Sequence, residues 1–214
     1  MKGIIFDLDG VIIHTDHLHY LAWEKMASQF HLSFDEMLNH KLRGISRMDS
    51  LNTIIKHNNA SFSYDQKEKM ADIKNTYYQS FLDELTENDL DKEIKDTLDE
   101  LKIMGYKLAI GSSSRNAKRI LKNIGLIDFF DAISDGTNIE KSKPDPEVFL
   151  KAADQLGLNP KECCVIEDAD AGIEAAKNAG MIAIGYGGAK DSELTDIKLN
   201  TFSDLIDIVK GPLK

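Results

Sequence analysis

The stretch that decides the fold is KGIIFDLDGV, residues 2–11, in which an apolar run ends in two carboxylates and a glycine. Apolar runs of this length are typical of buried strands in parallel sheets, where successive side chains point to opposite faces. We therefore expect Asp7 and Asp9 on one side and Leu8 on the other. Carboxylates this close repel each other, and a divalent cation or a reacting phosphoryl group commonly offsets the repulsion. The alternative is that Asp9 and Gly10 form only a hairpin turn.

The composition indicates a globular protein with a substantial apolar core. The chain has 214 residues, 42% of them hydrophobic, which is enough for one large domain or for a core with a smaller second unit. Its 26 Lys and Arg face 36 Asp and Glu, so the net charge is −10. Because no basic field attracts nucleic acid or anionic lipid, we expect no nucleic-acid and no membrane partner. Local positive charge must capture any anionic substrate.

The sequence shows no targeting segment and no cysteine framework. The N-terminal apolar run is too short for a signal peptide and is followed at once by Asp7, and no run approaches the length of a membrane span. We therefore expect a cytoplasmic location. Cys163 and Cys164 are adjacent in an apolar stretch, where a disulfide between them would be strained. We expect both to be reduced core residues.

Two periodicities divide the chain. Residues 15–85 carry a helical period with almost no strand signal, and the first apolar stripe consists of Leu18, Leu21, Ala22, Met26 and Phe30. From residue 90 onward helices and strands alternate. The expected strands after the first are 106–110, 164–166 and 181–184. Expected helices span 94–101 and 172–178, another runs through Ile120 and Leu121, and a further one follows Pro146 with its inward residues Phe149, Ala152, Ala153 and Leu156. Alternation of this length predicts right-handed crossovers and a parallel sheet, with a helical insert after the first strand.

Polar residues follow the ends of three expected strands: Asp7, Asp9, Ser112, Ser113, Ser114, Glu167 and Asp168. Lys143 lies on a nearby loop. Ligands of open parallel sheets collect outside the carboxyl ends of the strands, so we expect these side chains around one crevice. The four carboxylates are a plausible ligand set for Mg²⁺, and hydroxyls at the start of a helix bind phosphate. The alternatives are that Asp168, Asp170 and the serines only cap helices and that Lys143 is solvated.

These motifs, in this order, resemble those of the haloacid dehalogenase superfamily and, within it, the β-phosphoglucomutase family. The resemblance implies a Rossmann-like α/β core of residues 1–14 and 87–214, with an inserted helical cap of residues 15–86. It also implies that Asp7 is a nucleophile that becomes an aspartyl phosphate and that Asp9 is the general acid and base. Ser112 and Lys143 would hold the transferring phosphoryl group. Mg²⁺ would be bound by Asp7, the backbone carbonyl of Asp9, Glu167 and Asp168.

The helical insert extends the resemblance to the substrate pocket. Thr15, His19 and Trp23 match the hinge and first cap helix of that family, and KLRGISRMDSL, residues 41–51, resembles its specificity loop. In that loop Arg47 would grip the phosphate that is not being transferred, and the sugar pocket would be lined by Gly44, Ile45 and Ser46. The alternative is that Ser46 only caps a helix, in a capping box with Asp49, and that Arg47 is solvated.

Further positions match the family with some departures. The core-side substrate loop would consist of Ser114, Arg115 and Asn116, although the family commonly has Ala at Ser113 and Lys at Arg115. His14 replaces an acidic residue. Lys74 and Asn75 align with a cap segment that can touch the distal phosphate, but a surface helix predicts that they are solvated. The histidines of residues 14–19 offer a transition-metal site as a weaker alternative.

The activity that the resemblance implies is interconversion of β-D-glucose 1-phosphate and β-D-glucose 6-phosphate, through β-D-glucose 1,6-bisphosphate. The partners would be the small phosphosugar and this bisphosphate, and we expect a monomer. The nearest alternative is a Mg²⁺-dependent phosphatase of the same superfamily that acts on small sugar phosphates. A phosphonate hydrolase would need a cap lysine that forms a Schiff base, and none stands out. A catalytically silent phosphosugar-binding module would not need the intact Asp7 and Asp9.

Overall fold

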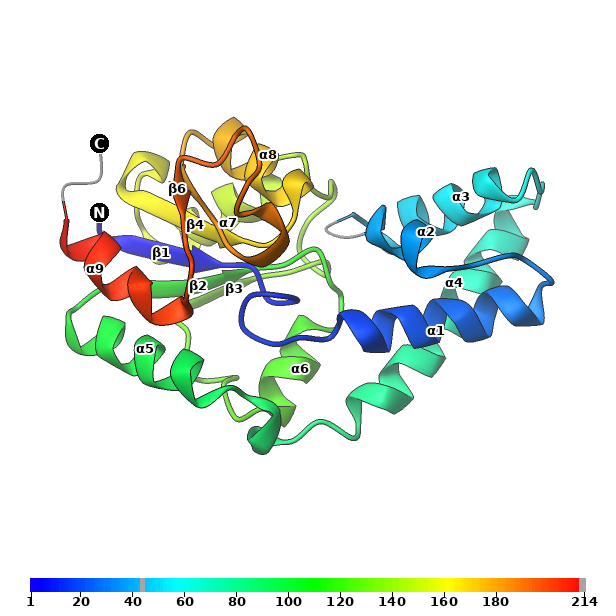
Figure 1. Cartoon of the computed structure of the whole chain (residues 1–214), viewed down its shortest axis with the longest axis horizontal. Coiled ribbons are helices and arrows are strands. Elements are labelled where there is room, and N and C mark those ends of the chain that lie inside the picture. Colours follow the sequence, from blue (N-terminus) through cyan, green and yellow to red (C-terminus); the bar gives the residue numbers. More distant parts are fainter. Residues whose placement is uncertain (43–44, 212–214) are drawn as a thin grey trace.

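The computed structural model describes residues 1–42 and 45–211. It has two parts, an α/β part built around one sheet and a helical part beside it (Figure 1). Gly44, predicted to line the sugar pocket, lies outside the described residues. The carboxyl ends of the central strands face the helical part, and the N-terminus lies at the opposite end of the α/β part (Figure 1).

Within the described residues, six strands form one sheet in the order β3-β2-β1-β4-β5-β6, and every neighbouring pair is parallel. The strands are β1 Gly3–Phe6, β2 Lys107–Gly111, β3 Ala132–Ser134, β4 Cys163–Glu167, β5 Ile182–Gly185 and β6 Ile197–Lys198. Phe6 pairs with Ile110 of β2 and with Ile166 of β4. Because of this register, Asp7 and Glu167 lie at the same level, at the carboxyl edge of the sheet. The predicted α/β fold is confirmed.

Helices cover both faces of the sheet, and each face has its own apolar cluster. The helices of this part are α5 Lys92–Ile103, α6 Ala117–Asn123, α7 Glu147–Leu156, α8 Asp170–Asn178 and α9 Leu205–Lys210, with 3₁₀ helices at Glu87–Asp89, Pro160–Glu162, Gly187–Ala189 and Phe202–Asp204. Ile4 and Phe6 point into a cluster with α5, α6 and α9, whereas Ile5 points into one with α7 and α8. The alternation along β1 therefore supplies both layers of the core.

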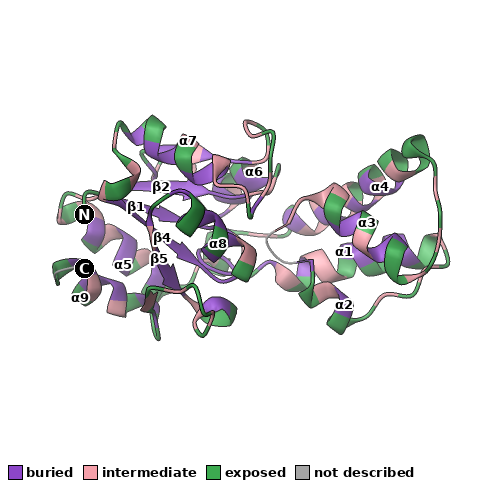
Figure 2. Ribbon diagram, turned by 90° about the horizontal axis from the view of Figure 1, so that it is seen from above, coloured by how far each residue is buried: buried purple, intermediate pink, exposed green. Residues whose placement is uncertain are grey.

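The described residues of the helical part, which we call the cap, form four helices: α1 Asp16–Gln29, α2 Glu36–His40, α3 Arg47–His57 and α4 Tyr64–Leu82. Buried residues line the inner faces of these helices (Figure 2) and form a third apolar cluster, which includes Met26, Leu51 and Met70. Near the sheet, α1 and α4 also contribute residues to the core cluster, namely Leu18, Ala22, Tyr78 and Leu82. The domain boundaries at 14/15 and 86/87 remain a prediction.

Two predictions from periodicity differ from the structure. Leu21 was expected in the buried stripe of α1 but is 37% exposed, because it lies at the edge of the stripe whose centre is Leu18, Ala22 and Met26. The strands β3 and β6 were not predicted, since three and two residues are too few to show a period.

Cys163 and Cys164 are buried and free, as expected. In the described part of the chain, every helix is too short or too polar to cross a bilayer.

The cap cluster gives a test of packing. Leu51 of α3 is fully buried in it, so Leu51→Ala should lower the free energy of unfolding by about 2–5 kcal/mol through lost burial and a residual cavity. Urea unfolding followed by circular dichroism measures this loss. The control is Met37→Ala on α2, where a 75% exposed side chain should change stability by about 0.5 kcal/mol or less. Equal stabilities of the two variants would contradict the assigned core.

Candidate active site

Three buried carboxylates meet where β1 and β4 end. Oxygens of Asp7, Glu167 and Asp168 lie within 4.8 Å of one another. The main chain fixes them, because Asp7 N–H donates to Ile166 O at 3.0 Å and Ala169 N–H donates to Glu167 Oε2 at 2.9 Å. Of the residues described, no other set of acidic, His or Cys side chains converges in this way, so the histidines of residues 14–19 do not form the alternative metal site.

Lys143 is buried between two of these carboxylates. Its Nζ lies 2.5 Å from Asp7 Oδ1 and 2.5 Å from Glu167 Oε1. Burial alone would lower the pKa of Lys143, but the two carboxylates raise it above its usual range. Burial raises the pKa of Asp7 well above its usual range, against the opposing effect of Lys143. The ammonium is therefore fixed in charge and in place, and the alternative that Lys143 is a solvated loop lysine is wrong.

The acidic group fits a magnesium ion. Asp7, Glu167, Asp168 and Lys143 together carry a formal charge of −2, and carboxylate oxygens are the ligands that Mg²⁺ prefers. The carboxylate of Asp9 lies outside this group, so the four acidic side chains do not surround one point. Its backbone carbonyl remains a predicted ligand. At the start of α8, Ala169 occupies the N-cap position and makes no side-chain cap bond, so neither Asp168 nor Asp170 is the N-cap residue of this helix.

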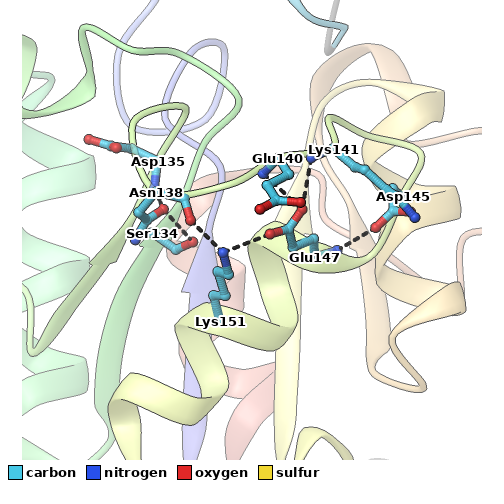
Figure 3. A network of polar contacts seen from close by, with 8 residues as sticks. All are labelled: Ser134, Asp135, Asn138, Glu140, Lys141, Asp145, Glu147 and Lys151. Atoms are coloured by element: carbon cyan, nitrogen blue, oxygen red, sulfur yellow. Dashed lines mark hydrogen bonds and ion pairs between the residues drawn. The ribbon is translucent and has the colours of Figure 1, made fainter.

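A polar network holds the loop that carries Lys143 (Figure 3). Glu147, the first residue of α7, accepts hydrogen bonds at Oε2 from the N–H groups of Glu140 at 3.0 Å and Lys141 at 2.8 Å. Lys151 Nζ lies 2.7 Å from Glu147 Oε1 and donates to Asn138 O at 2.5 Å. The bonds from Lys151 and from the Lys141 N–H lower the pKa of Glu147 to about 2. The loop is thus tied to α7 just before it reaches the carboxylates.

The Asp9 carboxylate turns toward the cap. Its Oδ1 accepts a hydrogen bond from Thr15 Oγ1 and one from the Tyr78 hydroxyl at 3.3 Å, and His19 Nε2 lies 3.8 Å away. Burial raises the pKa of Asp9, while the bonds from Thr15 and Tyr78 oppose the rise. Tyr78 is 1% exposed and was not identified from the sequence. The one available signal was its spacing of four residues from Lys74, which places both on one face of α4.

Lys74 is buried, although its position on a surface helix predicted that it is solvated. It is 3% exposed, not solvated, and its Nζ lies 2.9 Å from His19 Nδ1 and over the rings of Trp23 and Tyr78. Burial and the nearby Arg47 lower the pKa of Lys74 to about 7, although Asp9 opposes them. Burial, followed by the charges of Lys74 and Arg47, also lowers the pKa of His19 well below its usual range. The cap therefore presents a buried, weakly basic amine at the cavity.

One cavity of about 490 Å³ joins the acidic group to the cap. All described residues predicted for the site lie on its wall except Thr15, which is fully buried: Asp7, Asp9, His19, Trp23, Ile45, Ser46, Arg47, Ser112, Ser114, Arg115, Asn116, Lys143, Glu167 and Asp168. Ser46 caps α3 by accepting from Asp49 N–H at 3.1 Å. The neighbouring Arg47 is half-buried rather than solvated. Ser113 lines the cavity, whereas His14 is exposed.

Comparison with known proteins agrees with this fold. Residues 4–186 match the sequence model of the haloacid dehalogenase-like hydrolases, and the chain belongs to this family. A β-phosphoglucomutase of Bacillus subtilis is 44% identical over 207 residues, which cover 96% of this chain and 92% of that protein. A fructose-1-phosphate phosphatase of Escherichia coli is 31% identical over 188 residues, covering 85% and 94%.

A solved structure also matches the fold of this chain. The crystal structure of a β-phosphoglucomutase from Clostridium difficile has a TM-score of 0.93 and 38% sequence identity, and the match covers 98% of this chain and 96% of that one. The resemblance to the β-phosphoglucomutase family that the motifs indicated is confirmed.

The close approach of α8 to Glu167 gives a test of the acidic group. A Cβ on Gly172 would lie 1.8 Å from Glu167 Oε1, so Gly172→Ala must displace that carboxylate. We expect Mg²⁺ affinity, measured by isothermal titration calorimetry, to fall at least tenfold. The matched control is Gly211→Ala, because Gly211 has an ordinary φ of −78° and its added Cβ would meet no atom nearer than 3.5 Å. Unchanged Mg²⁺ affinity in Gly172→Ala would exclude Glu167 as a ligand.

The loop network predicts a second effect. Glu147→Ala removes the acceptor of two backbone N–H groups and should slow Mg²⁺-dependent hydrolysis of p-nitrophenyl phosphate by about tenfold, since each lost hydrogen bond costs about 1 kcal/mol. Glu147→Gln keeps an acceptor oxygen and should retain most of the rate. Glu174→Ala on the exposed face of α8 serves as the control. If Glu147→Ala turns over at the wild-type rate, the loop does not depend on this network.

Proposed function

We propose that the protein interconverts β-D-glucose 1-phosphate and β-D-glucose 6-phosphate through an aspartyl-phosphate enzyme and β-D-glucose 1,6-bisphosphate. The observation that carries the proposal is a single cavity lined by Asp7 at the end of β1, by Lys143 of the loop before α7 and by Arg47 of the cap helix α3. Such a cavity suits a sugar with two phosphates. The named relatives support it, because the β-phosphoglucomutase of Bacillus subtilis is 44% identical and the phosphatase of Escherichia coli 31%.

Asp7 carries the phosphoryl group. Phosphorylated Asp7 gives the group to the free hydroxyl of a bound glucose monophosphate, and Asp9 accepts the hydroxyl proton as the new P–O bond forms and the acyl phosphate bond breaks. The other phosphate of the bisphosphate then returns its phosphoryl group to Asp7. Asp9 gives its proton to the departing sugar oxygen. Proton and phosphoryl group are thus restored after each cycle.

Positive charge stabilises the transfer. The Lys143 ammonium, held 2.5 Å from Asp7, and the Ser112 hydroxyl bind the transferring phosphoryl oxygens. Mg²⁺, held by Asp7, the backbone carbonyl of Asp9, Glu167 and Asp168, would supply further charge neutralisation at the phosphoryl group. The buried position of the Asp9 carboxyl raises its pKa, which suits a group that must both donate and accept a proton.

The cap holds the other end of the substrate. The guanidinium of Arg47 binds the phosphate that is not being transferred, together with Ser114, Arg115 and Asn116 of the core. Ile45 and Ser46 line the sugar pocket, and His19 and Trp23 of α1 form another side of it. Thr15 acts through its hydrogen bond to the Asp9 carboxylate. Closure of the cap excludes water from phosphorylated Asp7, so the bisphosphate can turn and present either end.

The remaining features of the proposal concern the setting of the enzyme. We propose a cytoplasmic monomer whose partners are a small phosphosugar and β-D-glucose 1,6-bisphosphate as intermediate and activator. The net charge of −10 argues against nucleic-acid and anionic lipid partners. The alternative activity is a Mg²⁺-dependent sugar phosphatase, in which water instead of a sugar hydroxyl attacks phosphorylated Asp7.

An assay with anomerically pure β-D-glucose 1-phosphate, Mg²⁺ and a trace of the bisphosphate separates these activities. We expect rapid formation of glucose 6-phosphate, whereas free phosphate as the main product would establish the phosphatase. Asp7→Asn should abolish turnover and phosphoenzyme formation, since an amide cannot form the acyl phosphate. Substantial turnover by Asp7→Asn would refute the role of Asp7 as nucleophile.

A further inference from the structure

Both polar atoms of the Asn116 side chain are hydrogen-bonded to residues of the cap helix α4. Asn116 Nδ2 donates to Asn75 Oδ1 at 3.0 Å, and Gln79 Nε2 donates to Asn116 Oδ1 at 3.1 Å. Asn75 and Gln79 are four residues apart, so they lie on one face of α4. Two amides one helical turn apart therefore fix both the position and the orientation of a third amide across the boundary between the cap and the α/β part.

Asn75 holds a second cavity residue as well. Its Oδ1 also accepts a hydrogen bond from Arg47 Nη2 at 2.8 Å. One oxygen thus receives a donor from cap helix α3 and a donor from the core loop before α6. Arg47 and Asn116 both line the cavity, whereas Asn75 and Gln79 are not part of its wall. The two residues of α4 therefore act on the cavity only through the side chains that they hold.

The geometry of Asn116 indicates that these contacts replace an ordinary local one. Asn116 occupies the N-cap position of α6, where an Asn side chain commonly bonds the first free N–H groups of the helix. Here it makes no such cap and is only 7% exposed. Its hydrogen-bonding groups are used instead on Asn75 and Gln79.

Electrostatics explain why Arg47 needs a partner. Burial and the nearby Arg115 both lower the pKa of Arg47, so the two guanidinium groups repel each other in this corner of the cavity. A neutral carbonyl oxygen can hold Arg47 there without cancelling the positive charge that would attract a phosphate. A carboxylate at the same place would cancel it.

We propose that Asn75 and Gln79 are positioning residues that place Arg47 and Asn116 together as donors to one distal phosphate, and so select substrates with a second anionic group. The inference rests on the proposed function and deepens it. The distal phosphate would then be aligned by Asn75 and Gln79 of α4, although these two residues do not themselves contact it. The same hydrogen bonds fix the position of the cap relative to the core beside the distal phosphate.

The test is Asn75→Leu, which keeps the number and branching of the non-hydrogen side-chain atoms and removes the acceptor. We expect KM for β-D-glucose 1-phosphate to rise about tenfold, with a smaller change in kcat. Phosphorylation of Asp7 by acetyl phosphate, which has no second phosphate, should stay within about twofold of wild type. Asn75→Asp restores an acceptor for both donors but adds a negative charge, so its KM should lie between those of wild type and Asn75→Leu.

Two controls separate positioning from folding. Asn52→Leu makes the same change at an exposed Asn of α3 whose Oδ1 accepts from Lys67, and it should leave both reactions unchanged. In a double-mutant cycle, Asn75→Leu should raise KM by less in the Arg47→Ala background than in wild type, because one of the two donors that Asn75 holds is already absent.

The outcomes distinguish this inference from the proposed function. Additive losses in the cycle, equal losses with both phosphoryl donors, or an unchanged KM in Asn75→Leu would each overturn the positioning role while wild-type mutase activity stands. Absence of mutase turnover in the wild-type protein would overturn the proposed function, and the inference with it.

Discussion

The buried contact of Lys143 with Asp7 and Glu167 is the constraint on which the site depends. It joins the ends of β1 and β4 to the loop before α7, at 2.5 Å to each carboxylate. Removing three such charges from water is costly, so the arrangement is poor stabilisation for its own sake. The surrounding structure holds it in place, through the shared register of β1 and β4, the backbone bonds that Glu147 accepts, and the absence of a side chain at Gly172. This concentration of fixed charge is what phosphoryl transfer requires.

The cap meets this site through one helix used in two ways. The end of α4 near the sheet contributes Tyr78 and Leu82 to the core cluster, which anchors the cap by apolar contact. On the cavity side, Tyr78 hydrogen-bonds Asp9, and Lys74 meets His19. Asn75, the residue after Lys74 in α4, accepts a hydrogen bond from Asn116. A single rigid element thus touches the group proposed to move protons and the group proposed to bind the distal phosphate, so a shift of the cap acts on both together.

Much of the core could be predicted from local pattern. The apolar strands, their polar ends and the alternation with helices gave the parallel sheet, because each signal depends on residues close in the chain. Where the pattern was short or lay at the edge of a stripe it failed, as at β3, β6 and Leu21. The site residues with motif character were found in the same way. Tyr78 and the burial of Lys74 were not, because a lysine or tyrosine on an amphipathic helix carries no signal of what will cover it.

By itself the sequence determined the order of the elements, the residue types at the strand ends and the acidic character of the site. Only the tertiary structure decided that Asp9 faces Thr15 and Tyr78 rather than the other carboxylates, that Lys143 and Lys74 are buried, and that Asn75 joins Arg47 to Asn116. The physical reason is range. Periodicity and capping act over a few residues. Except for the contacts of Asp9 with Thr15 and of Lys74 with Tyr78, these contacts join residues 24 to 136 positions apart in the chain. Their pKa values and hydrogen bonds depend on burial that only the folded chain creates.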